Sequence, residues 1–146
     1  MAKSRAESST RILFYFILAA SAAVCGFFAS NIVQFFGSMC ANRIVDSTLS
    51  PDGRHEAVLF ERDCGATTDF SSQVAVIPYG TDLPNIYGNV FMAEPHGNPR
   101  RAPWGGPRVA IRWQSADHLV VTYDKNSHIY RRETKIGDVS VSYQTD

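Results

Sequence analysis

Residues 108–123 read RVAIRWQSADHLVVTY, a pattern that indicates the fold class. In its first part every second residue is apolar, so that Val109, Ile111 and Trp113 share one face of an extended strand. The alternation stops at a short polar turn, SADH, and resumes in HLVVTY. A period of two residues is typical of β-strands, so this stretch predicts two neighbouring strands.

The same kind of pattern continues through the rest of the second part of the chain. HEAVLFER (55–62) and QVAVI (73–77) are more uniformly apolar, as expected of central strands that are covered on both faces. Further strands are predicted at residues 43–48, 88–93, 129–135 and 139–143. Short polar turns separate the strands, including SPDG (50–53), DKNS (124–127) and IGD (136–138).

We therefore expect an all-β domain of about eight antiparallel strands, arranged as a small meander or sandwich. Its single hydrophobic core is expected to contain Phe60, Trp113, Tyr123 and Tyr143. The segments LSPDGRHEAVLFE and RWQSADHLVVTYD are similar to each other and to strand pairs of propeller blades. Because a propeller needs about four or more blades of four strands, the chain is too short for one, and a single blade-like sheet is the compatible version.

The beginning of the chain has a different composition. Residues 12–37 contain no charged side chain, and a helix of this length is long enough to cross the roughly 30 Å hydrocarbon layer of a bilayer. Lys3, Arg5 and Arg11 precede this run, which places the N-terminus in the cytoplasm by the positive-inside rule. The predicted organisation is a cytoplasmic tail (1–11), a transmembrane signal-anchor helix (12–37) and an extracytoplasmic β-domain (38–146).

Two alternatives to an uncleaved anchor stay open. Signal peptidase cleavage at the small residues ASA (20–22) would leave a strongly apolar mature N-terminus. Lipidation at Cys25 or Cys40 would require a lipobox, and the residues before both cysteines match one poorly. The uncleaved signal anchor is the preferred interpretation.

Small residues recur every fourth position along the predicted membrane helix. Ala22, Gly26 and Ser30 lie on one face, and Gln34 continues it. Such a face lets two helices approach closely, and a glutamine can hydrogen-bond across the contact. The pattern predicts self-association or association with a partner helix, although small residues are common in membrane helices in general.

The segment FERDCGATTDFSSQV (60–74) joins two predicted strands and contains a thiol, hydroxyls and acids. In one interpretation Cys64 or a nearby hydroxyl is a nucleophile, but no histidine, lysine or elbow motif identifies its base. In the other, Cys64 forms a disulfide with Cys40, because the predicted topology exports both cysteines and leaves Cys25 in the membrane. We expect the disulfide and assign no catalytic residue.

The remaining polar residues of this segment have two interpretations. Side chains such as those of Thr67, Thr68, Asp69 and Ser71 can brace a wide turn by hydrogen bonds to the backbone. The same four residues are also candidates for contacts with a binding partner. Bracing of the turn is the preferred interpretation, and the binding role stays open.

A second candidate contact segment is the loop at residues 94–108, EPHGNPRRAPWGGPR. Its prolines and glycines exclude a continuous strand or helix, and long loops of this kind are either functional or mobile. Arg100, Arg101 and Trp104 are the residues expected to contact lipid headgroups or a protein partner. A solvated loop without a partner is the preferred interpretation, and these contacts are the alternative.

Composition excludes some classes of function. The formal net charge is zero, which argues against nucleic acid as a partner because phosphate binding needs a basic surplus. The four histidines are scattered singly and no cysteine pair has zinc-ligand spacing, so no metal site is expected. No cofactor is expected either.

Several of these motifs together carry a resemblance. LSPDGRHEAVLFERDCGATTDFSSQVAVI, GNVF (88–91) and VAIRWQSADHLVVTY resemble an uncharacterised bacterial family of short envelope proteins with an SPDG…ERDCGATT core. Members are lipoproteins or membrane-anchored proteins, and many have a cysteine shortly before the SPDG turn, where Cys40 stands here. The resemblance implies an exported domain with a Cys40–Cys64 pair, and it implies no activity.

The sequence leads to one preferred function and two alternatives. We expect a single-pass protein of the bacterial inner membrane that displays a periplasmic β-domain, which acts as a binding module for a protein of the envelope. The alternatives are an envelope hydrolase or transferase that uses Cys64 or nearby hydroxyls, and a structural subunit that forms oligomers through its membrane helix.

Overall fold

The computed structural model describes residues 17–28, 40–65 and 69–146. The chain divides into two compact units, Met1–Met39 and Cys40–Asp146. In the first unit residues 17–28 form a helix. Within the three described ranges no helix is long and apolar enough to cross a membrane. Residues 12–16 and 29–37 of the predicted membrane span lie outside the described residues, so the signal anchor stays a prediction.

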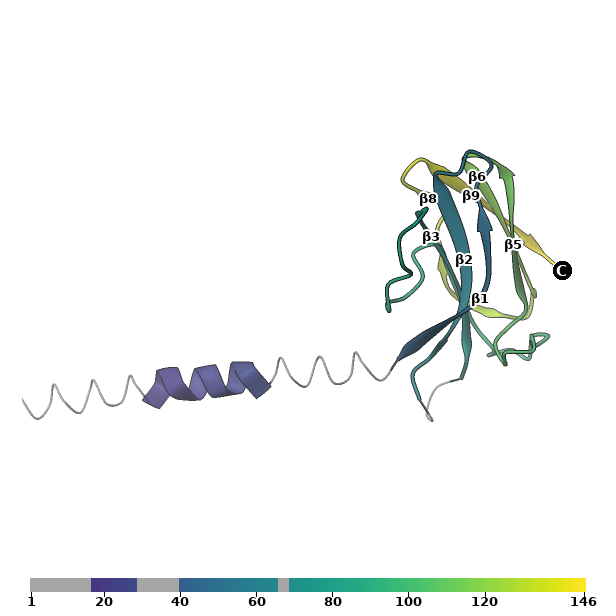
Figure 1. Cartoon of the computed structure of the whole chain (residues 1–146). Coiled ribbons are helices and arrows are strands. Elements are labelled where there is room, and N and C mark those ends of the chain that lie inside the picture. The colour runs from purple at the N-terminus through teal and green to yellow at the C-terminus, as the bar shows by residue number, and fades with distance from the viewer. Residues whose placement is uncertain (1–16, 29–39, 66–68) are drawn as a thin grey trace, which may run out of the picture. The chain divides into compact units, whose positions relative to one another are not determined.

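The second unit is all-β, as the alternating patterns predict (Figure 1). Its strands are β1 (Ala41–Leu49), β2 (His55–Asp63), β3 (Ser71–Pro78), β4 (Phe91–Glu94), β5 (Val109–Ser115), β6 (His118–Tyr123), β7 (His128–Arg132), β8 (Lys135–Ile136) and β9 (Val139–Thr145). They form a five-stranded sheet in the order β1-β2-β3-β4-β7 and a four-stranded sheet in the order β5-β6-β9-β8. The two sheets pack as a sandwich around one core.

The expectation of purely antiparallel pairing is wrong at one place, because β6 and β9 run parallel to each other. After β6 the turn at residues 124–127 does not form a hairpin within the sheet. It leads instead into β7, which pairs with β4 in the other sheet. The chain then returns through β8, so β9 enters the four-stranded sheet in the same direction as β6.

Two predicted strands differ from the structure by more than two residues at an end. The strand expected at 88–93 begins only at β4, because the Asn89 side chain accepts from Val76 N and donates to Val76 O, both at 2.9 Å. An amide side chain thus replaces strand backbone beside β3. The strand expected at 129–135 divides into β7 and β8 because the chain changes sheets between them.

The main core lies between the two sheets, and one core assignment is wrong. Tyr123 is buried there, and Trp113 and Tyr143 pack against it. Phe60, however, lies in a second cluster with Val58, Ala75 and Ile77. Successive side chains of a strand point to opposite faces, and Leu59 already faces the main core. Phe60 therefore faces outward, under a cover that residues 79–90 provide through Leu83.

Candidate functional site

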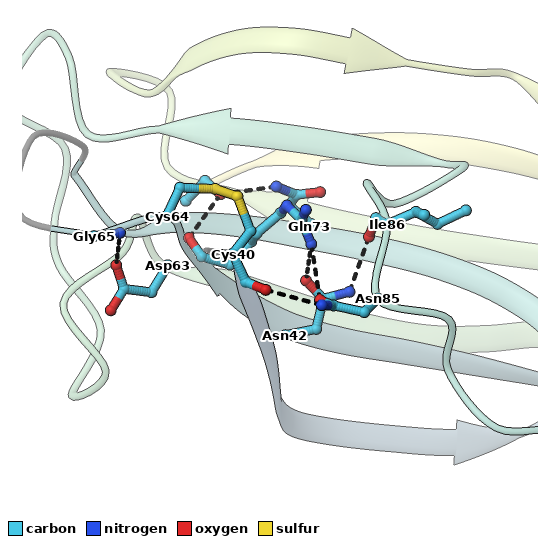
Figure 2. Close-up of a disulfide and its surroundings, with 10 residues drawn as sticks. Cys40, Asn42, Asp63, Cys64, Gly65, Gln73, Asn85 and Ile86 are labelled. Atoms are coloured by element: carbon cyan, nitrogen blue, oxygen red, sulfur yellow. Dashed lines mark hydrogen bonds between the residues drawn. A yellow bond between two sulfur atoms is a disulfide. The ribbon is translucent and has the colours of Figure 1, made fainter. Parts of the chain in front are cut away.

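Cys40 and Cys64 form a disulfide across a sequence separation of 24 residues, as predicted (Figure 2). The bond joins the residue before β1 to the residue after β2. It also removes the thiolate that a nucleophilic Cys64 would need in this oxidised form. Cys25, in the other unit, is a free and exposed cysteine.

The segment that follows Cys64 is braced at both of its described ends. Gly65 N donates to Asp63 Oδ1 over 2.8 Å, which closes the start of the turn. At the other end Ser71 is buried and its Oγ donates to Arg62 O over 3.4 Å. Asp69 is exposed. The predicted contact residues Thr67 and Thr68 lie outside the described residues.

The start of β3 carries three consecutive buried polar residues, Ser71, Ser72 and Gln73. Ser72 Oγ donates to Pro107 O over 2.7 Å and accepts from Trp104 Nε1 over 3.0 Å. Gln73 Oε1 accepts from Gly88 N over 2.8 Å. These neighbouring side chains therefore hold two different loops, one at residues 94–108 and one at residues 79–90. This role was not predicted from the sequence. The signal for it was the run of three polar residues directly before an apolar strand.

Backbone hydrogen bonds within the loop at residues 94–108 give it a defined structure. Ala102 N donates to Gly106 O and Gly105 N donates to Ala102 O, both over 2.9 Å. Arg101 and Pro107 form a β-bridge. The loop thus closes on itself as a small hairpin before it enters β5.

The three predicted contact residues of this loop have different environments. Arg100 forms ion pairs with the buried Asp124 at 2.8 Å and with Asp146 at 2.9 Å. The Arg100 hydrogen bond, together with one from Asn126 N, lowers the pKa of Asp124 to about 2. Trp104 is half-buried against the core. Only Arg101 is exposed without an ion pair in the described chain, and its Nη1 donates to Gly105 O over 3.0 Å.

The structure brings the two predicted contact segments together. A Cβ built on Gly105 would lie 2.8 Å from Phe70 Cδ2, so the half-exposed Phe70 ring lies directly against the loop. Next to this junction is a hollow of about 220 Å³, lined by Arg43, Ile44, Val45, Pro103 and Trp104. The described residues of the two segments, 63–65, 69–72 and 100–108, therefore adjoin one another, and we call them the loop surface.

A buried arginine holds the other loop next to the disulfide. Arg62 Nη1 donates to Asn42 Oδ1 over 2.6 Å and to Asn85 Oδ1 over 3.2 Å. Its guanidinium also lies over the Tyr87 ring, 4.8 Å from the centroid. Asn85 Nδ2 in turn donates to Cys40 O over 2.8 Å (Figure 2). This amide network was not predicted, because its members are far apart in the sequence.

Asn42 completes the network and borders a second hollow. Its Nδ2 donates to Pro84 O over 3.0 Å and to Ile86 O over 2.8 Å. The hollow beside it has a volume of about 420 Å³ and is lined by Ala41, Asn42, Ile44, Asp82, Leu83 and Asn85. Ile86 and Tyr87 are 62% and 57% exposed, so the loop presents apolar surface beside this hollow.

One pair of residues has the distance expected of a nucleophile and its base. His118 Nε2 lies 2.8 Å from Ser142 Oγ, and His118 Nδ1 lies 3.3 Å from Ser140 Oγ. No carboxylate orients the ring within the described chain, since Asp117 Oδ1 accepts from Ser115 Oγ. The pair joins the parallel strands β6 and β9, and we assign it a structural role.

The predicted helix-association residues fall only partly within the structure. Ala22 and Gly26 lie in the helix at residues 17–28, and a Cβ built on Gly26 meets no atom within 4 Å. Ser30 and Gln34 lie outside the described residues. In the part of the chain that the structure covers, no three metal-ligating side chains form a cluster.

A scan against protein-family models, a search of curated proteins and a search of solved structures each gave no match. The resemblance to the envelope family therefore stays a prediction from the motifs themselves. Functional inference rests on the geometry of this chain alone.

Proposed function

We propose that this chain is a single-pass protein of the bacterial envelope whose β-domain is a binding module for another envelope protein. The binding site is the loop surface, residues 63–65, 69–72 and 100–108. The observation that carries the proposal is the fixation of these two sequence-distant segments to each other through Ser72, Trp104 and Pro107.

The loop surface has the properties of a prepared interface. Its two segments are held by the disulfide, by the Ser72 hydrogen bonds and by the Arg100–Asp124 ion pair. Preorganised loops lose little conformational entropy when a partner binds, which favours affinity. Phe70, Asp69 and Arg101 are left exposed on this surface, and aromatic and arginine side chains are enriched in protein interfaces.

The location in the envelope rests on the N-terminal sequence and on the disulfide. Disulfides form and persist in oxidising compartments such as the bacterial periplasm. The apolar run at residues 12–37 ends three residues before Cys40, the residue at which the disulfide fixes the chain to the domain. An anchored β-domain outside the cytoplasm agrees with both features.

Site-specific photocrosslinking in intact cells tests the proposal. A photoreactive amino acid at Arg101 is expected to capture a discrete protein adduct, because this side chain lies in the loop surface. The matched position is Lys135, an exposed residue of β8 on the four-stranded sheet. Equal adducts at Arg101 and Lys135 would contradict the loop surface as the binding site. So would the absence of any adduct both at Arg101 and in a second variant that carries the photoreactive amino acid at Phe70.

Assembly through the membrane helix is a second candidate role. Residues 17–28 are helical, and Ala22 and Gly26 lie four residues apart on one face, a spacing of small residues that lets two helices approach closely. In-membrane crosslinking of the full chain is expected to give a dimer or larger species that the change Gly26→Leu reduces. Unchanged oligomers in this variant would exclude this face as the contact.

A further inference from the structure

Strand β1 is an end strand of the five-stranded sheet and pairs only with β2. An end strand leaves a row of backbone N–H and C=O groups without sheet partners. Within the described chain, hydrogen bonding reaches the outer edge of β1 only near its end, where Trp113 Nε1 donates to Thr48 O over 2.9 Å. A β-bulge between Ile44 and Asp46 separates that closed part from the beginning of the strand. Residues 41–44 are therefore an open, short edge.

The two hollows described above lie on opposite faces of this open edge. Asn42 and Ile44 are opposite Arg62 and Phe60, and so they face outward, toward the hollow with Asp82 and Leu83. Arg43 is opposite Glu61 on the inner face and lines the hollow with Pro103 and Trp104. Side chains of an added strand would alternate between the two faces. An added strand could therefore hydrogen-bond to the backbone of residues 41–44. Its alternate side chains would face one hollow on each side of the sheet.

Charge around the edge selects the chemistry of the occupant. The Arg43 guanidinium donates to both carboxylate oxygens of Glu61, at 2.8 and 2.9 Å, so its charge is already balanced. Asp82 lines the outer hollow and has no ion pair within the described part of the chain, whereas Asp46 is opposite Leu59 and so belongs to the inner face. The outer face therefore favours a basic side chain. The inner hollow, between Pro103 and Trp104, favours an apolar one.

We propose that an extended segment of the partner protein adds to the sheet at residues 41–44 of β1, with basic and apolar side chains in alternation. Strand addition of this kind derives affinity from main-chain hydrogen bonds and specificity from the pockets for alternate side chains. The inner hollow is shared with the loop surface through Trp104, so one partner can occupy both. This inference rests on the proposed binding function and identifies the form of the partner.

A synthetic peptide tests this inference directly. The probe is a fluorescent octapeptide of alternating lysine and valine, titrated into the full chain in phosphatidylcholine nanodiscs, with empty nanodiscs as the blank. We expect saturable binding and new protection from hydrogen exchange at residues 41–44. A peptide of four lysines followed by four valines, and the alternating peptide with every amide N-methylated, are expected to bind at least about tenfold more weakly.

Variants of the protein locate the binding. Ile44→Lys, at the residue that lines both hollows, is expected to weaken binding of the alternating peptide by about tenfold or more. Asp82→Lys is expected to weaken it by about fivefold because it reverses the charge of the outer hollow. Leu49→Lys is the matched control, since Leu49 is exposed on the same strand beyond the bulge, and it should change affinity less than about twofold.

Three results would overturn the inference. The first is that the N-methylated peptide binds as tightly as the unmodified alternating peptide. The second is that the Ile44→Lys variant binds the alternating peptide as tightly as the native chain does. The third is that the native chain self-associates and that Ile44→Lys abolishes this, because the edge would then bind a second copy of the chain. Adduct formation at Arg101 is independent of the peptide experiment. If the peptide does not bind but the adduct at Arg101 still forms, only strand addition is contradicted. If the adduct at Arg101 does not form, the proposed binding function itself is contradicted.

Discussion

The loops at residues 79–90 and 94–108 are alike in how they are held and different in what they cover. Each is anchored by one buried polar side chain of β3, Gln73 for the first loop and Ser72 for the second. Each also brings a glycine against β3, since a Cβ on Gly88 would lie 2.6 Å from Val74 O and a Cβ on Gly106 2.6 Å from Ser72 Oγ. Neither glycine leaves room for a side chain.

The two loops differ in which hydrophobic cluster each one covers and in which neighbouring segment each one contacts. Residues 79–90 cover the outer cluster around Phe60 and are fixed mainly by amide hydrogen bonds and Arg62. Residues 94–108 pack Trp104 against the main core and join the segment after Cys64. Two adjacent polar residues at the start of one strand thus organise two separate surfaces, and only the second carries the proposed binding site.

Loss of the disulfide should have the largest effect, because it cross-links two residues that are 24 positions apart in the sequence. Replacing Cys40 and Cys64 by serine is expected to lower the free energy of unfolding by roughly 3 kcal/mol, since the unfolded chain gains the freedom of a 24-residue loop. Chemical denaturation measures this loss. Cys25→Ser is the control, and an equal loss there would contradict a specific role of the Cys40–Cys64 pair.

The two glycines provide the next test. Gly88→Ala is expected to destabilise the domain by about 2–3 kcal/mol, because the obstacle to its Cβ is the backbone oxygen of Val74. Gly106→Ala should cost about 1 kcal/mol less, since its nearest obstacle is a hydroxyl on a side chain that can rotate. Denaturation midpoints compare the two variants. A larger loss for Gly106→Ala would mean that the second loop is the more tightly held.

Gln73→Leu separates the two loops from each other. The change keeps the volume of a buried side chain but leaves Gly88 N without its acceptor, which should cost about 2 kcal/mol. Hydrogen exchange is expected to accelerate at Gly88 and to stay unchanged at Ala102 and Gly105. Gln114→Leu, at an exposed position of β5, should change stability by less than about 0.5 kcal/mol. Acceleration in both loops would show that Gln73 does not act on one loop alone.

Substitutions of Arg100 and Arg101, in the second loop, are expected to have the smallest effects. Arg100→Ala should destabilise the domain at pH 7, whereas Arg101→Ala should leave stability unchanged and reduce crosslinking or partner binding. The pKa of Asp124 is lowered in the folded state, so its stabilising contribution is present above the ordinary aspartate pKa and is lost as the pH falls through about 2. The difference between native protein and Arg100→Ala should therefore shrink from pH 4 to pH 2. Thermal denaturation across this range measures it, and a constant difference would contradict the ion pair.

Much of the fold was predictable because alternation along a strand is a local property. The strands around Val109 and Leu119 and the Cys40–Cys64 pair were predicted correctly. The outward face of Phe60 was not, because the four central residues of HEAVLFER, AVLF (57–60), are all apolar and do not mark which face is which. Nor was the parallel pairing of β6 with β9, since strand order depends on contacts between distant segments.

The candidate site was only partly predictable for the same reason. Sequence reasoning selected both segments of the loop surface, from their unusual composition. It gave no sign that Ser72 joins them, because its bond with Trp104 spans 32 residues. The outer edge of β1 and its two hollows were also invisible, since an edge exists only once the order of strands is known.

Fluorescence of Trp104 tests most directly whether Ser72 holds the loop surface together. The chain has two tryptophans, so Trp113→Phe leaves Trp104 as the single reporter. We predict that Ser72→Ala shifts Trp104 emission to longer wavelength and increases its quenching by acrylamide, while Ser47→Ala, at an exposed position of β1, changes neither. Identical emission and quenching in the Ser72→Ala variant would contradict the account, because the two segments would then be joined without Ser72.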